Sequence, residues 1–257
     1  IESVDIIPNA KIRSEKFKNE KCEKLKSRTR KGIPDSMRSY AWQKLTDFDS
    51  AFKKDKYQQL DKEPVDKEVE ALIVKDIDRT FPNCQFFMER YGNGQRLLLK
   101  VLSNYSKYNK DFPDLKKKCY VLLKLEKKFI PKIYQILKRD EIYPSAYATE
   151  WFISIFSRTL DFKVLVRILD TFLLEGFKVI YRFSLAFLKL KEKDFIEKQD
   201  INVASMLILN NCLKNVKTKE LFKVAFSFSI SKKYIESCEK EYESIKDDKQ
   251  NEFIGQL

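Results

Sequence analysis

Histidine is absent from this chain of 257 residues, and glycine and proline are scarce. Without histidine the chain has no Ser-His-Asp or Cys-His catalytic site, and it lacks the commonest general base and a frequent zinc ligand. Only 5 glycines and 7 prolines are available for hairpin turns and glycine-rich phosphate loops. The composition therefore favours an α-rich protein whose chemistry rests on arginine, lysine, carboxylates, amides or hydroxyls.

Cysteine pairs and long apolar runs are missing as well. The five cysteines are scattered and never form a Cys-x-x-Cys pair, so we expect reduced thiols rather than a disulfide framework or a zinc site. The most apolar stretch, residues 164–190, is interrupted by charged residues such as Arg167 and Arg182, which argues against a membrane span. The chain begins at Ile1 without a signal sequence, and we interpret it as an excised, soluble, cytoplasmic domain.

The net charge of +13 is the most conspicuous feature of the composition. Such a charge fits binding to nucleic acid or to an anionic membrane. The lysines, however, alternate with acidic residues along the whole chain, as in residues 191–194, and solvated helix faces explain this pattern equally well. A nucleic-acid binder would rest on the charge alone and would show steeply salt-dependent binding. We therefore expect no nucleic-acid partner.

Apolar residues recur with helical spacing throughout, and no segment alternates as a strand does. The predicted helices cover residues 36–45, 65–79, 95–108, 115–130, 133–137, 146–156, 162–173, 177–190, 203–213, 221–226 and 232–248. Inward-facing residues are expected to include Asp76 and Ile77 in one helix and Leu98, Val101 and Tyr105 in another. The predicted fold class is all-α, without a sheet.

The helix over residues 36–45 follows a Gly-Ile-Pro turn, and Asp35 or Ser36 is predicted to be its N-cap. Its apolar stripe is predicted to consist of Met37, Tyr40, Ala41 and Leu45. Arg38 and Trp42 are four residues apart, so their side chains are neighbours on the helix surface, and the guanidinium is expected to stack on the indole.

Ile73, Asp76 and Arg79 are spaced three residues apart, which brings them close to one face of a helix. The helix is predicted to stop here, because Phe81 precedes Pro82 and is excluded from the helical region. Arg79 is thereby predicted to project from the last turn of a rigid element. Spacing alone also allows an ordinary surface ion pair between Arg79 and Asp76.

Five motifs occur in a fixed order along the chain. They are Gly32-Ile33-Pro34 with Arg38 and Trp42; Ile73, Asp76 and Arg79 with Thr80-Phe81-Pro82; Gly94-Gln95 to Tyr108-Asn109; Tyr147 with Trp151-Phe152; and Arg167 to Asp170 with Leu174-Glu175-Gly176. Between about residue 31 and residue 230 this order resembles the TBC domain, a GTPase-activating domain that acts on Rab GTPases. The resemblance implies two helical subdomains, at residues 31–110 and 111–257, after a lead-in over residues 1–30.

The resemblance also implies roles for individual residues. Arg79 would be an arginine finger supplied in trans to a Rab-type small GTPase, with Asp76 holding its guanidinium and Ile73 anchoring the helix. Arg38 and Trp42 would support a neighbouring helix. GTP and magnesium would belong to the partner, so the chain is expected to carry no cofactor or metal and to act as an activator in vesicle trafficking. A peripheral association with endomembranes through the partner is left open.

One departure from the family concerns a second finger, a glutamine in a Tyr-x-Gln-Gly-Met motif. The family has this motif shortly after the Tyr-Asn that matches Tyr108-Asn109, whereas Lys110 to Pro113 follow here directly. Either the printed sequence omits a stretch at this point, or the protein lacks it and is a Rab-binding scaffold with weak or no catalysis. Gln85 and Gln95 do not lie in the required motif.

Overall fold

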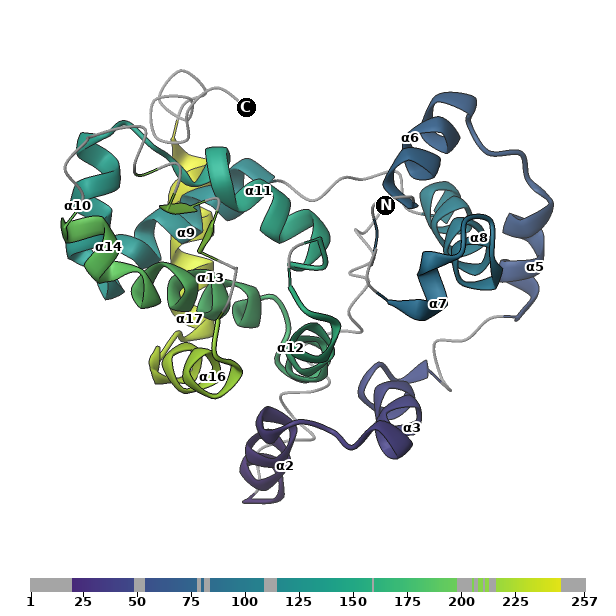
Figure 1. Ribbon diagram of the computed structural model, residues 1–257, viewed down its shortest axis with the longest axis horizontal. Helices are drawn as coiled ribbons and strands as arrows, with labels where there is room; N and C mark the ends of the chain where they lie inside the picture. Colours follow the sequence, from purple (N-terminus) through teal and green to yellow (C-terminus); the bar gives the residue numbers. More distant parts are fainter. Residues whose placement is uncertain are drawn as a thin grey trace.

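The computed structural model describes residues 20–48, 54–77, 80, 84–108, 115–158, 160–197, 205, 208–209, 211–212 and 216–245 (Figure 1). These residues form helices and no strand, which confirms the predicted all-α fold class. Within the described ranges, no helix combines the length and the apolarity that crossing a membrane requires. Arg79, most of the predicted helix at 203–213 and residues 1–19 of the predicted lead-in lie outside the described residues.

The described helices fall into two groups along the chain. The first group is α2 (Glu20–Lys31), α3 (Asp35–Leu45), α5 (Lys54–Lys62), α6 (Lys67–Ile77), α7 (Gln85–Met88) and α8 (Asn93–Tyr108). The second is α9 (Leu115–Phe129), α10 (Pro131–Arg139), α11 (Pro144–Ser154), α12 (Phe162–Glu175), α13 (Lys178–Leu190), α14 (Glu192–Glu197), α16 (Thr218–Ser227) and α17 (Lys232–Ser244).

Helix α13 is the centre of the bundle formed by α9 to α17 (Figure 1). All residues from 179 to 188 are buried, because α13 is apolar around most of its circumference and α9, α11, α12, α14 and α16 contact it from different sides. Aromatic rings fill the space between the helices: Phe187 lies 5.3 Å from Phe156 and 6.2 Å from Trp151 between ring centroids. The principal core of the molecule is therefore in this bundle.

Helices α5 to α8 form a second group, which Figure 1 shows to the side of the bundle. Helix α8 contacts α5, α6 and α7, but the buried apolar side chains in this group, among the described residues, are Leu60 and Ile77. Polar contacts hold much of the rest. Asn104 donates to Asp61 Oδ1 at 3.0 Å, and Lys107 donates to the carbonyl oxygen of Leu60 at 2.7 Å.

Helices α2 and α3 pack against α12 of the bundle. They precede α5 to α8 in the sequence, so the chain runs from the bundle side to the second group and back again (Figure 1). The subdomain boundary near residue 110 stays a prediction.

Three residues predicted to face inward do not. Val101 and Tyr105 of α8 and Asp76 of α6 are exposed. In α8 the buried positions include Gln95 and Asn104, whose amides bond to neighbouring segments and so determine which side of the helix is covered. Apolar spacing predicted the helix correctly and its buried side incorrectly.

Candidate functional site

The Gly-Ile-Pro turn between α2 and α3 depends on Gly32. Its φ of +107° lies in the left-handed half of the backbone map, where residues with a Cβ are strained. A Cβ there would also lie 3.2 Å from Nε of Arg167, whose guanidinium lies over the ring of Phe222 at 4.1 Å. The glycine therefore allows the start of α3 to approach α12 closely.

Asp170 of α12 is the group that fixes this approach. Its fully buried carboxylate accepts from Trp42 Nε1 at 2.7 Å and from Arg38 Nε at 3.1 Å. It also accepts from the backbone N–H of Ile33 at 2.9 Å. A buried carboxylate is stable only when donors of this kind satisfy it. Arg38 and Trp42 thus attach α3 to α12; their supporting role in a functional site stays a prediction.

Two expectations for α3 are wrong. Neither Asp35 nor Ser36 is the N-cap, because the helix already begins at Asp35 and the Asp35 carboxylate is bound by the Arg38 guanidinium. The predicted apolar stripe is not buried either: α3 has no buried residue, and Met37 and Tyr40 are exposed. The helix is held by Asp170 rather than by an apolar face. That shared carboxylate also joins Arg38 to Trp42, in place of the expected stacking.

A second buried carboxylate, Glu175, joins α2 to the end of α12. Arg30 donates to both of its oxygens, at 2.7 and 2.9 Å, and Arg182 donates at 2.7 Å. Burial raises the pKa of Glu175, but the hydrogen bonds from Arg30 and the charge of Arg182 outweigh it and lower the pKa to about 2. Gly176, with φ of +77°, ends α12 directly after this residue, as predicted.

The end of α6 is the place where the arginine finger was predicted. Ile77 is buried, and Ile73 is half-buried one turn earlier. Thr80 is hydrogen-bonded to the last turn of α6. Its Oγ1 donates to the carbonyl oxygen of Asp76 at 2.6 Å, and its backbone N–H donates to the carbonyl oxygen of Ile77 at 3.0 Å. Arg79 itself lies outside the described residues, so its role stays a prediction.

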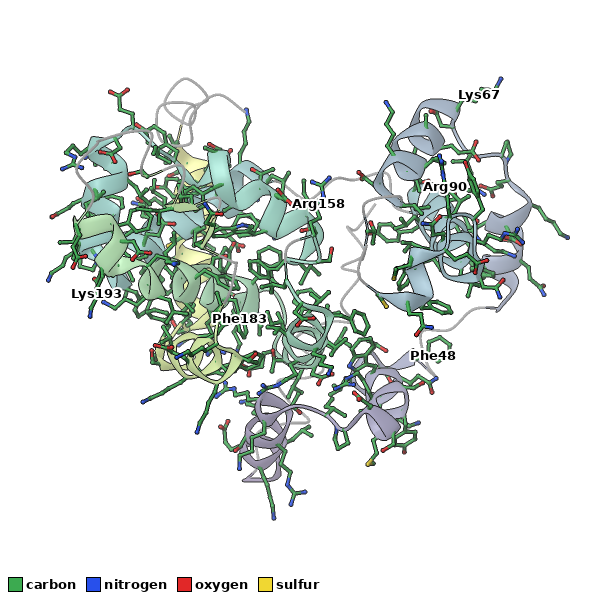
Figure 2. The ribbon with its side chains drawn as sticks, viewed as in Figure 1. Phe48, Lys67, Arg90, Arg158, Phe183 and Lys193 are labelled. Carbon is green, nitrogen blue, oxygen red and sulfur yellow. The ribbon has the colours of Figure 1, made fainter. Side chains whose placement is uncertain are left out.

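Asp76 forms an ion pair that the sequence did not indicate. Its Oδ1 lies 3.9 Å from Nη2 of Arg158, which follows α11 in the bundle. Figure 2 shows Arg158 on the side of the bundle that faces α6. This pair connects the bundle to the helix that precedes Arg79. It belongs to no motif, and no signal in the sequence links the two residues.

The turn that presents Arg158 is strained. Ile155 and Phe156 have φ values of +49° and +64°, and each non-glycine residue in this region costs about 1–3 kcal/mol. Phe156 is nevertheless fully buried against Trp151 and Phe187, and burial of a phenylalanine contributes about 1.5–3 kcal/mol. The aromatic core thus offsets part of the strain and holds the chain in the direction that brings Arg158 to Asp76.

Gln95 is occupied by a structural role. Its Oε1 accepts from the N–H of Tyr91 at 2.9 Å, and its Nε2 donates to the carbonyl oxygen of Phe87 at 3.1 Å. It is buried at the turn between α7 and α8. Gln85 is exposed at the start of α7.

The described residues contain no group of three or more His, Cys, Asp or Glu side chains suited to a metal ion. A groove of about 860 Å³ lies between α3 and α12, lined by Trp42, Leu169 and Leu173 among others. Its lining is mainly apolar and includes no glycine-rich loop. The groove is part of the joint between α3 and α12.

Comparison with known proteins gives one family. The sequence profile of the Rab-GTPase-TBC domain matches residues 35–112 and 108–196. The human "TBC1 domain family member 10B" is 29% identical over 219 residues, which cover 68% of this chain and 27% of that protein. The mouse "Ecotropic viral integration site 5 protein" is 26% identical over 277 residues, covering 89% and 34%. The "Rab GTPase-activating protein tbc-11" of Caenorhabditis elegans is 24% identical over 286 residues, covering 91% and 30%.

These curated relatives are much longer proteins, and the chain spans about a third of their length or less. Among solved structures, the crystal structure of the Chlamydomonas flagellar RabGAP TBC domain superposes with a TM-score of 0.69 at 22% identity. The superposition covers 86% of this chain and 90% of that one. At this identity the similarity shows the fold alone.

The alignments also contain positions that this chain does not fill. The 219 aligned positions with member 10B take in 68% of 257 residues, which is about 175, so roughly 45 positions of the relative have no residue here. The two profile segments overlap at residues 108–112, which puts the break directly after α8. The glutamine motif was expected at this point. Because the profile covers well over half of the sequence in chain order, the chain belongs to the Rab-GTPase-TBC domain family.

Proposed function

We propose that this chain accelerates GTP hydrolysis by a Rab-type small GTPase and supplies Arg79 in trans as an arginine finger. Membership of the Rab-GTPase-TBC domain family, with Ile73, Asp76 and Arg79 in the family's order, is the observation that carries the proposal. Phosphoryl transfer to water needs little covalent chemistry from the protein. It needs positive charge where negative charge develops between the β- and γ-phosphates, and it does not require histidine.

GTP and magnesium belong to the GTPase in this proposal. The chain has 5 glycines and no glycine-rich phosphate loop, so it has no evident nucleotide site of its own. Its contribution is a guanidinium, which is planar and can bind two phosphate oxygens at once. Any peripheral association with endomembranes would then come through the GTPase.

The supporting residues would act by limiting the positions open to Arg79. Asp76 lies three residues before it and within 3.9 Å of Arg158, so the same carboxylate can hold the finger on one side and connect α6 to the bundle on the other. Ile73 and Ile77 keep α6 against α8. Arg38 and Trp42, bound to Asp170, keep α3 on α12 and would support the framework rather than contact the nucleotide.

Single-turnover GTP hydrolysis on a panel of Rab GTPases tests the proposal. Arginine fingers contribute roughly 10³ to 10⁵ in rate, so Arg79→Ala should remove nearly all the stimulation that the unaltered chain provides. Arg139→Ala is the matched control, since Arg139 is an exposed arginine on α10 in the bundle. Full stimulation by the Arg79→Ala protein would contradict the finger assignment.

A second candidate function is a Rab-binding scaffold without GTPase activation. The roughly 45 unmatched positions, the break in the profile match at residues 108–112 and the absence of a Tyr-x-Gln-Gly-Met motif favour it, because the family's second finger belongs to that motif. The scaffold predicts measurable affinity for a GTP-loaded Rab and an unchanged hydrolysis rate. Measuring binding and hydrolysis with the same Rab separates the two functions.

A further inference from the structure

Glu126 of α9 carries a carboxyl group that neither the joint to α3 nor the proposed finger uses. The residue is 1% exposed, and Tyr147 of α11 donates its hydroxyl hydrogen to Oε1. Arginines bind the buried carboxylates of Asp170 and Glu175, whereas among the described residues no lysine or arginine binds Glu126. Burial without a cation raises the pKa of Glu126 to about 8, so at pH 7 most molecules carry a neutral, protonated group here.

The second oxygen of Glu126 borders open space. Within the described part of the chain no group is hydrogen-bonded to Oε2, and protein atoms do not seal this oxygen in. Because Oε1 accepts from Tyr147, the acidic hydrogen of the protonated group belongs on Oε2. Glu126 therefore offers an O–H donor that has no acceptor within the protein, and such a donor is costly to leave unpaired on a buried side chain.

A cavity of about 160 Å³ lies beside this group, between α9, α10 and the segment that leads into α11. Helix α9 contacts both α10 and α11 (Figure 1). Besides Glu126, the cavity is lined by aliphatic and tyrosine side chains, namely Leu123, Tyr134, Leu137, Ile142 and Tyr143. An apolar cavity of about 150 Å³ holds one benzene molecule, so this cavity has room for a single ring and not for a nucleotide.

The charges at the cavity select an uncharged ligand. Lys138 of α10 also belongs to the lining and is exposed, so a positive charge stands at the solvent side. This charge repels a cationic ligand, and the neutral carboxyl group of Glu126 does not offset the repulsion. An anionic ligand would lose its hydration against the aliphatic side chains. A neutral ring that carries a hydrogen-bond acceptor has neither penalty.

We propose that this cavity binds a small, uncharged nitrogen heteroaromatic ring, with the ring nitrogen accepting a hydrogen bond from Oε2 of Glu126. The ring carbons would contact Leu123, Leu137 and Ile142. Ligand sites in proteins generally combine such an apolar lining with a few polar groups that fix the orientation of the ligand. Because the site lies in the bundle and uses neither Arg79 nor α6, the proposal is independent of GTPase activation.

Three six-membered rings of nearly equal size test the ligand class at pH 7. Pyridine is neutral and has an acceptor nitrogen, benzene has no nitrogen, and piperidine is a cation. Each is titrated against the full chain, and binding is followed by nuclear magnetic resonance of ligand and protein. Pyridine should bind at least about tenfold more tightly than piperidine. No binding of pyridine, or equal binding of pyridine and piperidine, overturns the proposal.

Glu126→Met keeps the length of the side chain and removes the O–H donor. The affinity for pyridine should fall at least about threefold, whereas the affinity for benzene should not fall, because benzene does not use the donor. Glu220→Met is the matched control, since Glu220 is exposed on α16 and outside the cavity. Unchanged pyridine affinity in the Glu126→Met protein, or an equal loss in the control, contradicts the hydrogen bond.

Leu123→Trp tests the position of the site separately, and it keeps the proposal testable if circular dichroism shows that Glu126→Met does not fold. Leu123 is half-buried in the lining, so a larger side chain there can fill the cavity without replacing a fully buried residue. This substitution should abolish measurable binding of pyridine and of benzene. Pyridine binding that survives it contradicts the proposed site.

Discussion

The bundle of α9 to α17 and the group of α5 to α8 are both helical, but different interactions hold them. In the bundle, α13 is buried along ten consecutive residues and aromatic rings fill the space around it. In α5 to α8, the described buried apolar side chains are Leu60 and Ile77, and side-chain hydrogen bonds of Gln95 and Asn104 join the helices. The stable part of the molecule is therefore the bundle. The part that contains α6 and precedes the proposed finger has little core of its own and is expected to open more readily.

The largest predicted difference compares two phenylalanines. Phe187 of α13 is fully buried, whereas Phe86 of α7 is 55% exposed. Phe187→Ala should lower the free energy of unfolding by about 3–5 kcal/mol, because it leaves a cavity in the bundle. Phe86→Ala should change it by no more than about 0.5 kcal/mol. Urea unfolding followed by circular dichroism measures both, and equal effects would contradict the comparison.

The joint between α3 and the bundle gives the next prediction. Asp170→Ala leaves Arg38, the Trp42 N–H and the Ile33 N–H without their shared acceptor and should cost about 3 kcal/mol, as the removal of one partner of a buried ion pair does. Asp35→Ala removes an exposed carboxylate that also binds Arg38 and should cost at most about 1 kcal/mol. Urea unfolding gives both values, and the emission of Trp42 should shift only with Asp170→Ala. If the Asp170→Ala protein were as stable as the unaltered chain and its tryptophan emission were unchanged, Asp170 would not be the group that attaches α3 to the bundle.

Two carboxyl groups, Glu126 in the bundle and Asp61 in the second group, should also differ in how they respond to pH. Burial in the bundle raises the pKa of Glu126 to about 8, and the hydrogen bond donated by Tyr147 opposes this only in part. The pKa of Glu126 in the folded chain is above its unfolded value near 4.5. The contribution of protonated Glu126 to the free energy of unfolding is therefore complete below pH 4.5, and it is lost as the pH rises through about 8. Asp61 of α5 is the contrasting case: hydrogen bonds from Asn104 and Lys100 lower its pKa.

Unfolding free energy should therefore fall between pH 5 and pH 8.5 in the unaltered chain, and Glu126→Gln should flatten that slope. Asp61→Asn is the control, since Asp61 is already charged throughout this range and its replacement should leave the slope unchanged. Denaturant titrations at several pH values measure the slope. A slope that persists in the Glu126→Gln protein would contradict the assignment.

The sequence predicted helix limits correctly where the spacing of apolar residues, together with a proline or glycine at the helix end, decides them. The limits of α9, α12 and α13 follow from apolar periodicity and from punctuation by Pro131 and Gly176. The prediction was wrong where the burial of a side chain depends on which other helix packs against it. Periodicity reports which side of α8 is apolar but not whether a helix covers it, so Val101 and Tyr105 were predicted to be buried.

The candidate site shows the same division. Arg38 and Trp42 could be selected from their spacing, but not their common acceptor, Asp170, which is 128 residues beyond Trp42 in the chain. The contact of Arg158 with Asp76 depends on the strained turn at Ile155 and on the packing of Phe156 in the core of the bundle. Such contacts are set by tertiary structure and leave no local pattern to read.

The central claim is that Arg79 acts on a partner's nucleotide, and replacing Arg79 with lysine tests it most directly. Lysine keeps the positive charge but cannot reproduce the planar, two-pronged guanidinium. In single-turnover hydrolysis with a Rab that the unaltered chain stimulates, Arg79→Lys should lose most of the stimulation while keeping its affinity for the GTP-loaded Rab. Stimulation equal to that of the unaltered chain would contradict the account.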